Sequence, residues 1–82
     1  MKITTSIFKL TQGSAVTVVG YNRAYGGYKG KLIAKGIVPG TSFVALNLTL
    51  AEGAVQIMLK DKIIVLSKPE ANALCLNSHQ DL

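Results

Sequence analysis

The chain has 82 residues, of which 49% are hydrophobic and 16% are charged, and its formal net charge is +5 at pH 7. This length suits one domain with a modest core, and the hydrophobic content excludes a disordered chain. No apolar run approaches the roughly 20 residues of a membrane span. The first six residues carry no secretory signal pattern, and the one cysteine, Cys75, cannot form an internal disulfide, so we expect a cytoplasmic protein.

The first elements along the chain are a helical turn and a strand. Residues 7–13 have the pattern of a short helical turn that Ser6 can cap, with Ile7 directed toward one end of the core. Val16 and Val18 then alternate with other residues, as they do in a half-buried strand. We expect Gly20 to end this strand.

Residues 21–30 interleave three tyrosines with three glycines. Because each glycine inside a helix costs up to about 1 kcal/mol relative to alanine, we expect a loop through about Gly27 and a helix from about Tyr28. The tyrosines have two interpretations. They either cover the end of the barrel with only their hydroxyl groups in water, or they form an aromatic platform for a partner.

The helix is expected to stop at Gly36. Leu32 supplies an apolar side chain, while Lys31 and Lys35, four residues apart, share a more polar side of the helix. Glycine enters the left-handed conformation without a steric cost, so Gly36 is placed to end the helix. Ile37 can then fold back onto the helix as the apolar contact that often accompanies such a stop.

The chain then reverses and enters a second strand. Pro39 and Gly40 supply the fixed φ and the permissive residue of a type II turn. Residues 41–50 have the period of two that is typical of a strand. The alternating apolar side chains are those of Val44, Leu46, Leu48 and Leu50.

The second half of the chain predicts three further strands joined by tight turns. Residues 50–54 form a hairpin turn, residues 55–59 alternate as a strand, and residues 60–62 form a second, tighter hairpin. Residues 63–66 are β-branched and apolar with little alternation, which favours a strand buried on both faces. After a turn at residues 67–71, in which Pro69 suits a first helical position, residues 73–76 close the sheet.

These elements predict a mostly β fold with one short helix between the first and second strands. Closure of five short strands into a small SH3-like barrel removes exposed sheet edges at little cost in length. We therefore expect one domain over residues 1–82, with its core at about 7–76 and a frayed tail at 77–82.

The sequence L-I-A-K-G-I-V-P-G-T-S-F, residues 32–43, resembles the signature of the ferrous iron transport protein A family (FeoA). The matching turn residues are Leu32, Gly36, Pro39 and Gly40. The same pattern marks the small C-terminal domain of iron-dependent transcriptional repressors. The resemblance covers about residues 7–76, but the chain departs from it at residues 50–54, where the family carries proline-leucine-glycine-aspartate, and in the glycine-rich helical segment.

The residues that could support catalysis or metal binding are few and scattered. The single histidine, His79, is in the tail, and Cys75 in a terminal strand is best explained as a small core residue. The four acids lie apart at turns and in the tail: Glu52, Asp61, Glu70 and Asp81. This pattern contains no pair of acids for acid–base work, no metal-ligand spacing and no phosphate-binding loop, so we expect neither an enzyme nor a cofactor or metal site.

The resemblance implies a cytoplasmic accessory protein of ferrous iron uptake. Such a protein works with the large membrane ferrous iron permease, which carries a cytoplasmic GTP-binding part, and so lies at the inner membrane through its partner. In this chain the cations of residues 23–35 have no acid among them, which indicates either a solvated helix face or a docking surface. The candidate partner-binding residues are Arg23, Tyr25, Tyr28, Lys29, Lys31 and Lys35.

Two other functions remain as alternatives. Small barrels also bind nucleic acid, and here Tyr21, Arg23, Tyr25 and Lys29 would supply the stacking and phosphate contacts. The net charge of +5 is low for that role, so we do not expect nucleic acid as the partner. The chain could also correspond to a repressor's C-terminal domain, but it starts at a methionine and lacks a helix-turn-helix pattern.

Overall fold

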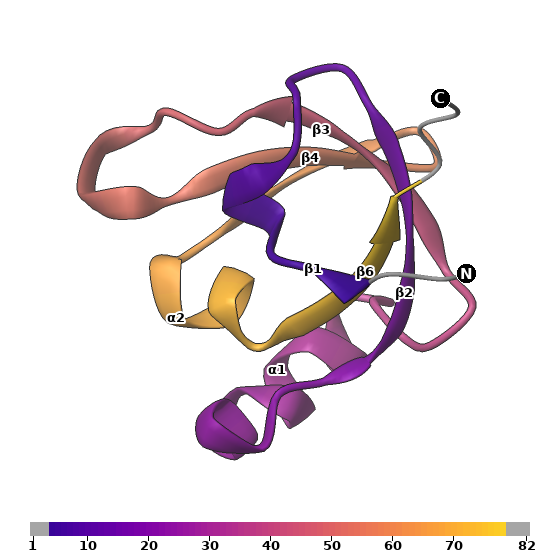
Figure 1. Ribbon diagram of the computed structural model, residues 1–82, viewed down its shortest axis with the longest axis vertical. Helices are drawn as coiled ribbons and strands as arrows, with labels where there is room; N and C mark the ends of the chain where they lie inside the picture. Colours follow the sequence, from indigo (N-terminus) through magenta and orange to yellow (C-terminus); the bar gives the residue numbers. More distant parts are fainter. Residues whose placement is uncertain (1–3, 79–82) are drawn as a thin grey trace.

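The structure, a computed structural model of the chain, describes residues 4–78. It is a single antiparallel sheet that curls around a hydrophobic core, with two short α-helices and three 3₁₀ turns in the connections (Figure 1). The strands are β1 (Thr4–Thr5), β2 (Ala15–Tyr21), β3 (Ser42–Asn47), β4 (Val55–Leu59), β5 (Lys62–Leu66) and β6 (Leu74–Ser78). The helices and 3₁₀ turns are η1 (Ile7–Lys9), η2 (Arg23–Tyr28), α1 (Lys29–Ala34), η3 (Ala51–Gly53) and α2 (Lys68–Asn72).

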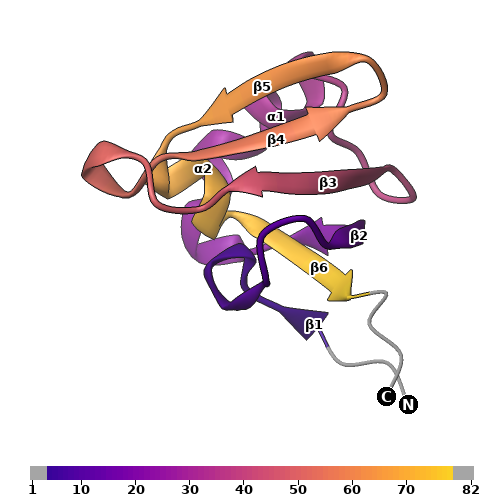
Figure 2. The same cartoon turned by 90° about the horizontal axis from the view of Figure 1, so that it is seen from above.

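The strand order is β1-β6-β2-β3-β4-β5, which places the last strand between the first two (Figure 2). Thr4 pairs with Asn77, and Val18 pairs with Leu76. The mostly β fold with a short helix between the first two long strands is therefore confirmed. The structure adds the two-residue strand β1, which is too short to show a period of two.

Closure of the sheet into a barrel is not found. Among the described strands, β1 and β5 stand at the two ends of the order and do not pair with each other. Only four of the five predicted strands have neighbours on both sides, and β5 pairs with β4 alone. The sheet therefore keeps a free edge at β5, which closure would have removed.

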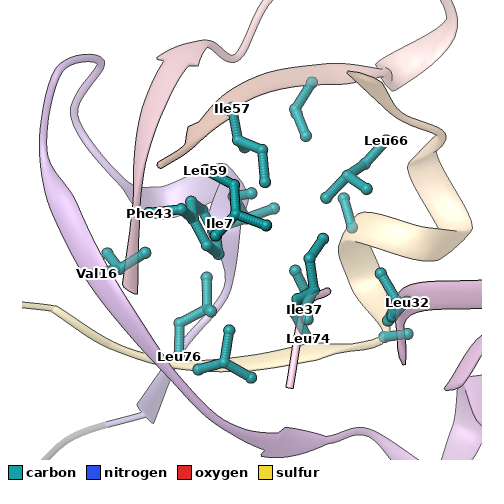
Figure 3. Packing of buried hydrophobic residues seen from close by; sticks show 14 residues of the cluster. Ile7, Val16, Leu32, Ile37, Phe43, Ile57, Leu59, Leu66, Leu74 and Leu76 are labelled. Atoms are coloured by element: carbon teal, nitrogen blue, oxygen red, sulfur yellow. The ribbon is translucent and has the colours of Figure 1, made fainter. Parts of the chain in front are cut away.

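The core is built from inward-facing side chains of the curled sheet and from the connections that cover its open side (Figure 3). Buried side chains come from nearly every element, and the largest that are fully buried are Ile7, Leu32, Ile37, Ile57, Leu66 and Leu76. The predicted cap at Ser6 is present, because its hydroxyl accepts a hydrogen bond from the Phe8 N–H at 3.3 Å. This cap starts the turn that carries Ile7 into the core.

Two strand predictions are wrong in the face that they bury. In β3 the buried residues are Phe43 and Ala45, whereas Val44 is only half-buried. In β5 the predicted burial on both faces fails, because Ile63 and Val65 are 58% and 53% exposed. An unbroken β-branched run fits either a central or an edge strand, and only the position in the sheet decides between them.

The predicted loop at residues 21–27 is also wrong. Asn22 caps the 3₁₀ turn η2 by accepting a hydrogen bond from the Ala24 N–H at 3.0 Å, and η2 runs directly into α1. The turn is irregular at Tyr25, whose backbone leaves the helical region. A glycine-rich segment therefore forms helical turns here, because a side-chain cap starts them and their tyrosines pack against the core.

The predicted stop at Gly36 is confirmed in detail. Gly36 has a φ of +84°, and its N–H donates to the Ile33 carbonyl at 2.9 Å. The N–H of Ile37 donates to the Leu32 carbonyl at 2.9 Å, and both of these side chains are fully buried. This is the Schellman arrangement with its apolar contact.

The type II turn that follows is confirmed as well. The Thr41 N–H donates to the Val38 carbonyl at 2.9 Å, and Gly40 has a φ of +93°. The Gly40 N–H in turn donates to the Val18 carbonyl at 2.8 Å, which ties the turn to β2. The junction between α1 and β3 is thus held both by its own backbone and by the neighbouring strand.

Replacing Gly36 should destabilise the fold through backbone strain alone. A Cβ at Gly36 would meet Leu59 at an ordinary 3.6 Å, so space is available, but the left-handed conformation costs roughly 1–2 kcal/mol for alanine and more for valine. Thermal or urea unfolding measures this loss. Gly30→Ala, in α1 with open space around its Cβ, is the control and should stabilise by up to about 1 kcal/mol. Equal stability of Gly36→Ala and the parent would contradict this account.

Candidate functional site

The candidate site lies on η2 and α1, where the sequence predicts a cationic surface. α1 buries Leu32 completely, whereas its neighbour Ile33 remains 46% exposed. Residues three and four apart are neighbours on a helix, so Ile33 lies beside Gly30 and Lys29. The free side of α1, meaning the side that faces away from Leu32 and the core, therefore combines apolar Ile33, Gly30, which has no side chain, and the cation Lys29.

Two lysines of α1 lie against tyrosine rings. The Lys29 Nζ is 5.6 Å from the centre of the Tyr21 ring, and the Lys31 Nζ is 5.4 Å from the centre of the Tyr28 ring. Residues two apart do not face each other on a helix, so these two pairs lie at opposite edges of the free side of α1 and do not form one cluster. Each contact is a cation–π interaction that restrains a long side chain at the surface.

The tyrosines are anchored on the body of the protein. The rings of Tyr21, Tyr25 and Tyr28 are half-buried and pack against the core. The Tyr21 hydroxyl donates a hydrogen bond to the Ile37 carbonyl at 2.7 Å, and burial raises the pKa of this hydroxyl. Covering the end of the sheet is therefore one role of these rings, and the Tyr21 hydroxyl is also bonded to the protein.

Three of the four predicted cations are free of acids. Arg23, Lys29 and Lys31 are exposed, and within residues 4–78 none of them forms an ion pair. We call the set Tyr21, Arg23, Tyr25, Tyr28, Lys29 and Lys31 the basic–aromatic surface. Five of these six residues, all except Tyr21, are among the partner-binding residues predicted from the sequence.

The fourth predicted cation, Lys35, is engaged elsewhere. Its Nζ lies 2.7 Å from the Glu70 Oε2, and the Glu70 side chain is only 9% exposed while that of Lys35 is 34% exposed. This ion pair joins the end of α1 to α2, which pack against each other in the fold (Figure 1). Lys35 thus contributes to the structure and is not part of the free cationic group.

Glu70 has a second role in the same place. Its Oε1 accepts hydrogen bonds from the Ser67 N–H and from the Ser67 hydroxyl, both at 2.9 Å. The Glu70 N–H donates to the Ser67 Oγ at 3.4 Å, which completes a capping box at the start of α2. The Glu70 carboxylate therefore caps the start of α2 through its Oε1 and binds Lys35 at the end of α1 through its Oε2.

These contacts change the pKa of Glu70. Burial raises the pKa, but hydrogen bonds from Lys35 and Ser67, together with the positive charge of Lys35, outweigh burial and lower it below the ordinary 4.5. A carboxylate with a lowered pKa stabilises the fold fully above its unfolded pKa. This contribution is lost as the pH falls through the lowered folded value.

The remaining acids and Cys75, as far as they lie within residues 4–78, do not form a metal-binding group. Within residues 4–78, no three His, Cys, Asp or Glu side chains lie close enough to hold a metal ion together. Cys75 is half-buried in β6, and His79 and Asp81 lie outside the described residues. In the same part of the chain, no helix has the length and apolar character needed to cross a membrane.

Sequence reasoning missed three residues of this region. Tyr21 was one of the three tyrosines with two interpretations, but it was named as a contact residue only in the nucleic-acid alternative. Ile33 was not among the predicted docking residues. Glu70 was read as an exposed acid at a turn. The pattern Ser67-x-x-Glu70 is a capping-box signal and could have identified α2, but nothing local indicates that Lys35 reaches it.

Comparisons with known proteins agree with this fold. The FeoA domain pattern matches residues 6–77. A crystal structure described as an iron uptake regulatory protein (FeoA) is similar with a TM-score of 0.76 and 17% identity, over 93% of this chain and 97% of that one. A Pseudomonas aeruginosa protein solved by NMR is similar with a TM-score of 0.69 and 19% identity, over 87% and 96% of the two chains.

The fold also occurs inside a larger protein. A manganese-dependent transcriptional repressor is similar with a TM-score of 0.83 and 17% identity, over 95% of this chain but only 43% of the repressor. At such identities these structures show the shared fold alone. No curated protein sequence gave a significant match to the chain.

Glu70→Gln should destabilise the fold at neutral pH by roughly 1–3 kcal/mol, because it removes the charge that Lys35 and Ser67 satisfy. The loss is smaller than for a fully buried pair, since Lys35 is partly exposed and water screens its charge. Urea unfolding across pH measures it. The difference from the parent should begin to narrow below about pH 4.5, where the carboxylate of the unfolded chain protonates, and should be lost as the pH falls through the lowered folded pKa of Glu70.

The control for this experiment is Glu52→Gln, which changes an exposed carboxylate without an ion pair in the described chain. It should leave stability within about 0.5 kcal/mol of the parent. A Glu70→Gln variant whose stability matches the parent at pH 7 would show that the two helices do not depend on this carboxylate.

Proposed function

Because this chain belongs to the FeoA family, we propose that it is an accessory protein of ferrous iron uptake that docks on the membrane ferrous iron permease. FeoA domains are small and non-enzymatic. The proposed contact is with the cytoplasmic GTP-binding part of the permease, which brings the protein to the inner membrane from the cytoplasmic side. The observation that carries this proposal is the free side of α1, where cations that form no ion pair within residues 4–78 flank an exposed isoleucine.

The apolar contact of the docking surface is Ile33. Its side chain is 46% exposed, so a partner can bury the remainder and gain hydrophobic free energy. Gly30, one turn earlier, has open space at its Cβ position, and Ala34 is small and exposed. These small residues allow a partner's backbone to approach α1 closely around Ile33.

The charged contacts surround this apolar centre. Arg23, Lys29 and Lys31 have no acid partner within residues 4–78, and the whole chain carries a net charge of +5. Such a surface accelerates the approach of an acidic partner. Because the tyrosine rings already restrain Lys29 and Lys31, less side-chain freedom is lost on binding.

The effect on transport follows from preferential binding. If the docking site on the permease is more accessible in one conformation or assembly state, binding shifts the equilibrium toward that state. The accessory protein needs no reactive group of its own for this role. Its affinity difference between the two states sets the size of the effect.

The nucleic-acid alternative receives less support from the geometry. A stacking platform needs exposed aromatic faces, whereas Lys29 and Lys31 lie over the rings of Tyr21 and Tyr28. The Tyr21 ring is further fixed by its hydrogen bond to Ile37. The arrangement suits a protein surface better than a strand of stacked bases.

Reversing two charges of the surface should weaken docking. The double variant Lys29→Glu, Lys31→Glu should lower affinity for the purified cytoplasmic part of the permease by about tenfold or more and reduce its salt dependence. Titration calorimetry at low and moderate salt measures both effects. The control Lys9→Glu, Lys60→Glu makes the same charge change at two exposed lysines elsewhere. Equal weakening by both pairs would leave only a general charge effect and contradict this docking site.

Truncating the apolar centre should also weaken docking, but without the salt effect. Ile33→Ser removes a half-exposed side chain, so stability should change by about 0.5 kcal/mol or less, while affinity for the permease part falls several-fold at every salt concentration. Val19→Ser is the matched control, since Val19 is 41% exposed on β2. Binding by Ile33→Ser as tight as that of the parent would place the contact elsewhere.

A further inference from the structure

Among the strands of residues 4–78, β5 pairs with β4 alone, so its free edge offers unpaired backbone groups at two positions. β4 and β5 are joined by a two-residue hairpin, and Leu59 pairs with Lys62 as its closing pair. In an antiparallel pair every second residue directs its N–H and C=O toward the partner strand, and the closing pair of such a hairpin does so. Ile57 therefore bonds Ile64, while Ile63 and Val65 direct their backbone groups away from β4.

This edge lacks the usual features that prevent strand addition. The pairing of β5 with β4 runs without a register shift from Leu59–Lys62 to Val55–Leu66, and β5 contains no proline. Its one charge, Lys62, stands at the first position. The opposite end of the sheet differs, because β1 has only two residues. β5 is thus the longer and more regular of the two edges.

Apolar side chains accompany these backbone groups. Ile63 and Val65 are 58% and 53% exposed on the outer face of the sheet. Met58, which is opposite Ile63 in register, is 37% exposed, and Val44 is opposite Met58 on β3. An apolar row therefore runs across the outer face and ends at the open edge.

We propose that a second copy of this chain pairs with β5, edge to edge and antiparallel. With the two-fold axis at Ile64, Ile63 of one copy lies opposite Val65 of the other, and each exchanges two backbone hydrogen bonds with its counterpart. The residues whose N–H and C=O point away from β4 thus lie opposite each other in the two copies, as a two-fold symmetric antiparallel pair requires. Their β-branched side chains meet on the outer face, where such cross-strand pairs are favourable.

The charges fit this register. Lys62 of each copy lies opposite Leu66 of the other, so the two Lys62 side chains stand at opposite ends of the paired strands instead of facing each other. A register centred on Lys62 would bring the two like charges together, which is unfavourable. The position of the one charged residue therefore selects the register that also aligns the free backbone groups.

The dimer is expected to be weak and to strengthen with salt. A stable interface buries about 800 Å² on each partner, and one five-residue strand with its apolar row covers only part of such an area. Each copy also carries a net charge of +5, so the two repel at low ionic strength. This salt dependence is opposite to that of docking on an acidic partner.

Sedimentation equilibrium of the full chain, from about 10 µM to about 1 mM, tests the proposal. We expect a monomer–dimer equilibrium whose association constant rises with sodium chloride concentration. Val65→Lys should lower the constant by about tenfold or more, since it places like charges on the paired edges. Val19→Lys adds the same charge at another exposed valine, and it should retain most of the association.

A proline variant tests the backbone contribution separately. Val65→Pro removes an N–H that points away from β4, so the hairpin ladder is kept, while a hydrogen bond to the second copy is lost. Circular dichroism checks that the fold is retained. We expect no dimer at the highest concentration at which the parent dimerises.

Two results would overturn the proposal: a parent that is monomeric throughout the range at high salt, or a dimer that survives both Val65 variants. The outcome is separate from that of permease docking. Lys29→Glu, Lys31→Glu should keep the β5 dimer, and Val65→Lys should keep the docking affinity, so either idea can fail without the other.

Discussion

The backbone of Ile37 is the point on which the arrangement of helix and sheet depends. Its N–H closes the helix stop on Leu32, its carbonyl accepts the Tyr21 hydroxyl, and its side chain is fully buried. One residue therefore connects α1, the end of β2 and the core. Gly36 makes this possible, because its left-handed conformation turns the chain back toward the core immediately after the helix.

The sequence predicts best those features that a few neighbouring residues determine. The cap at Ser6, the stop at Gly36 and the turn at Pro39 and Gly40 each need only local backbone chemistry, and all three are present. Phe43, by contrast, is buried because of how β3 sits in the sheet between β2 and β4, which the neighbouring residues in the sequence do not determine. The period of two alone does not decide which face of β3 is buried. The apolar residues Val44 and Leu46 lie on the face opposite to Phe43, and they made that face look like the buried one.

The candidate site shows the same division. Arg23, Lys29 and Lys31 could be identified because no acid lies near them in sequence. Lys35 could not be separated from them, because its partner Glu70 is 35 residues away and reaches it only through the packing of α1 on α2. One of the four acids of the chain is thus paired with Lys35 inside the structure, so within residues 4–78 the surface around α1 keeps three cations without an ion pair instead of the four that the sequence indicates.

The placement of β6 has a consequence for synthesis on the ribosome. β6 pairs with both β1 and β2, so these two early strands are not joined to each other until residues 74–78 have left the exit tunnel. Pairings between distant parts of a chain form slowly, because a long loop must close first. During translation, β3, β4 and β5 can assemble as consecutive neighbours, whereas the side of the sheet that holds β1 must wait for nearly the whole chain.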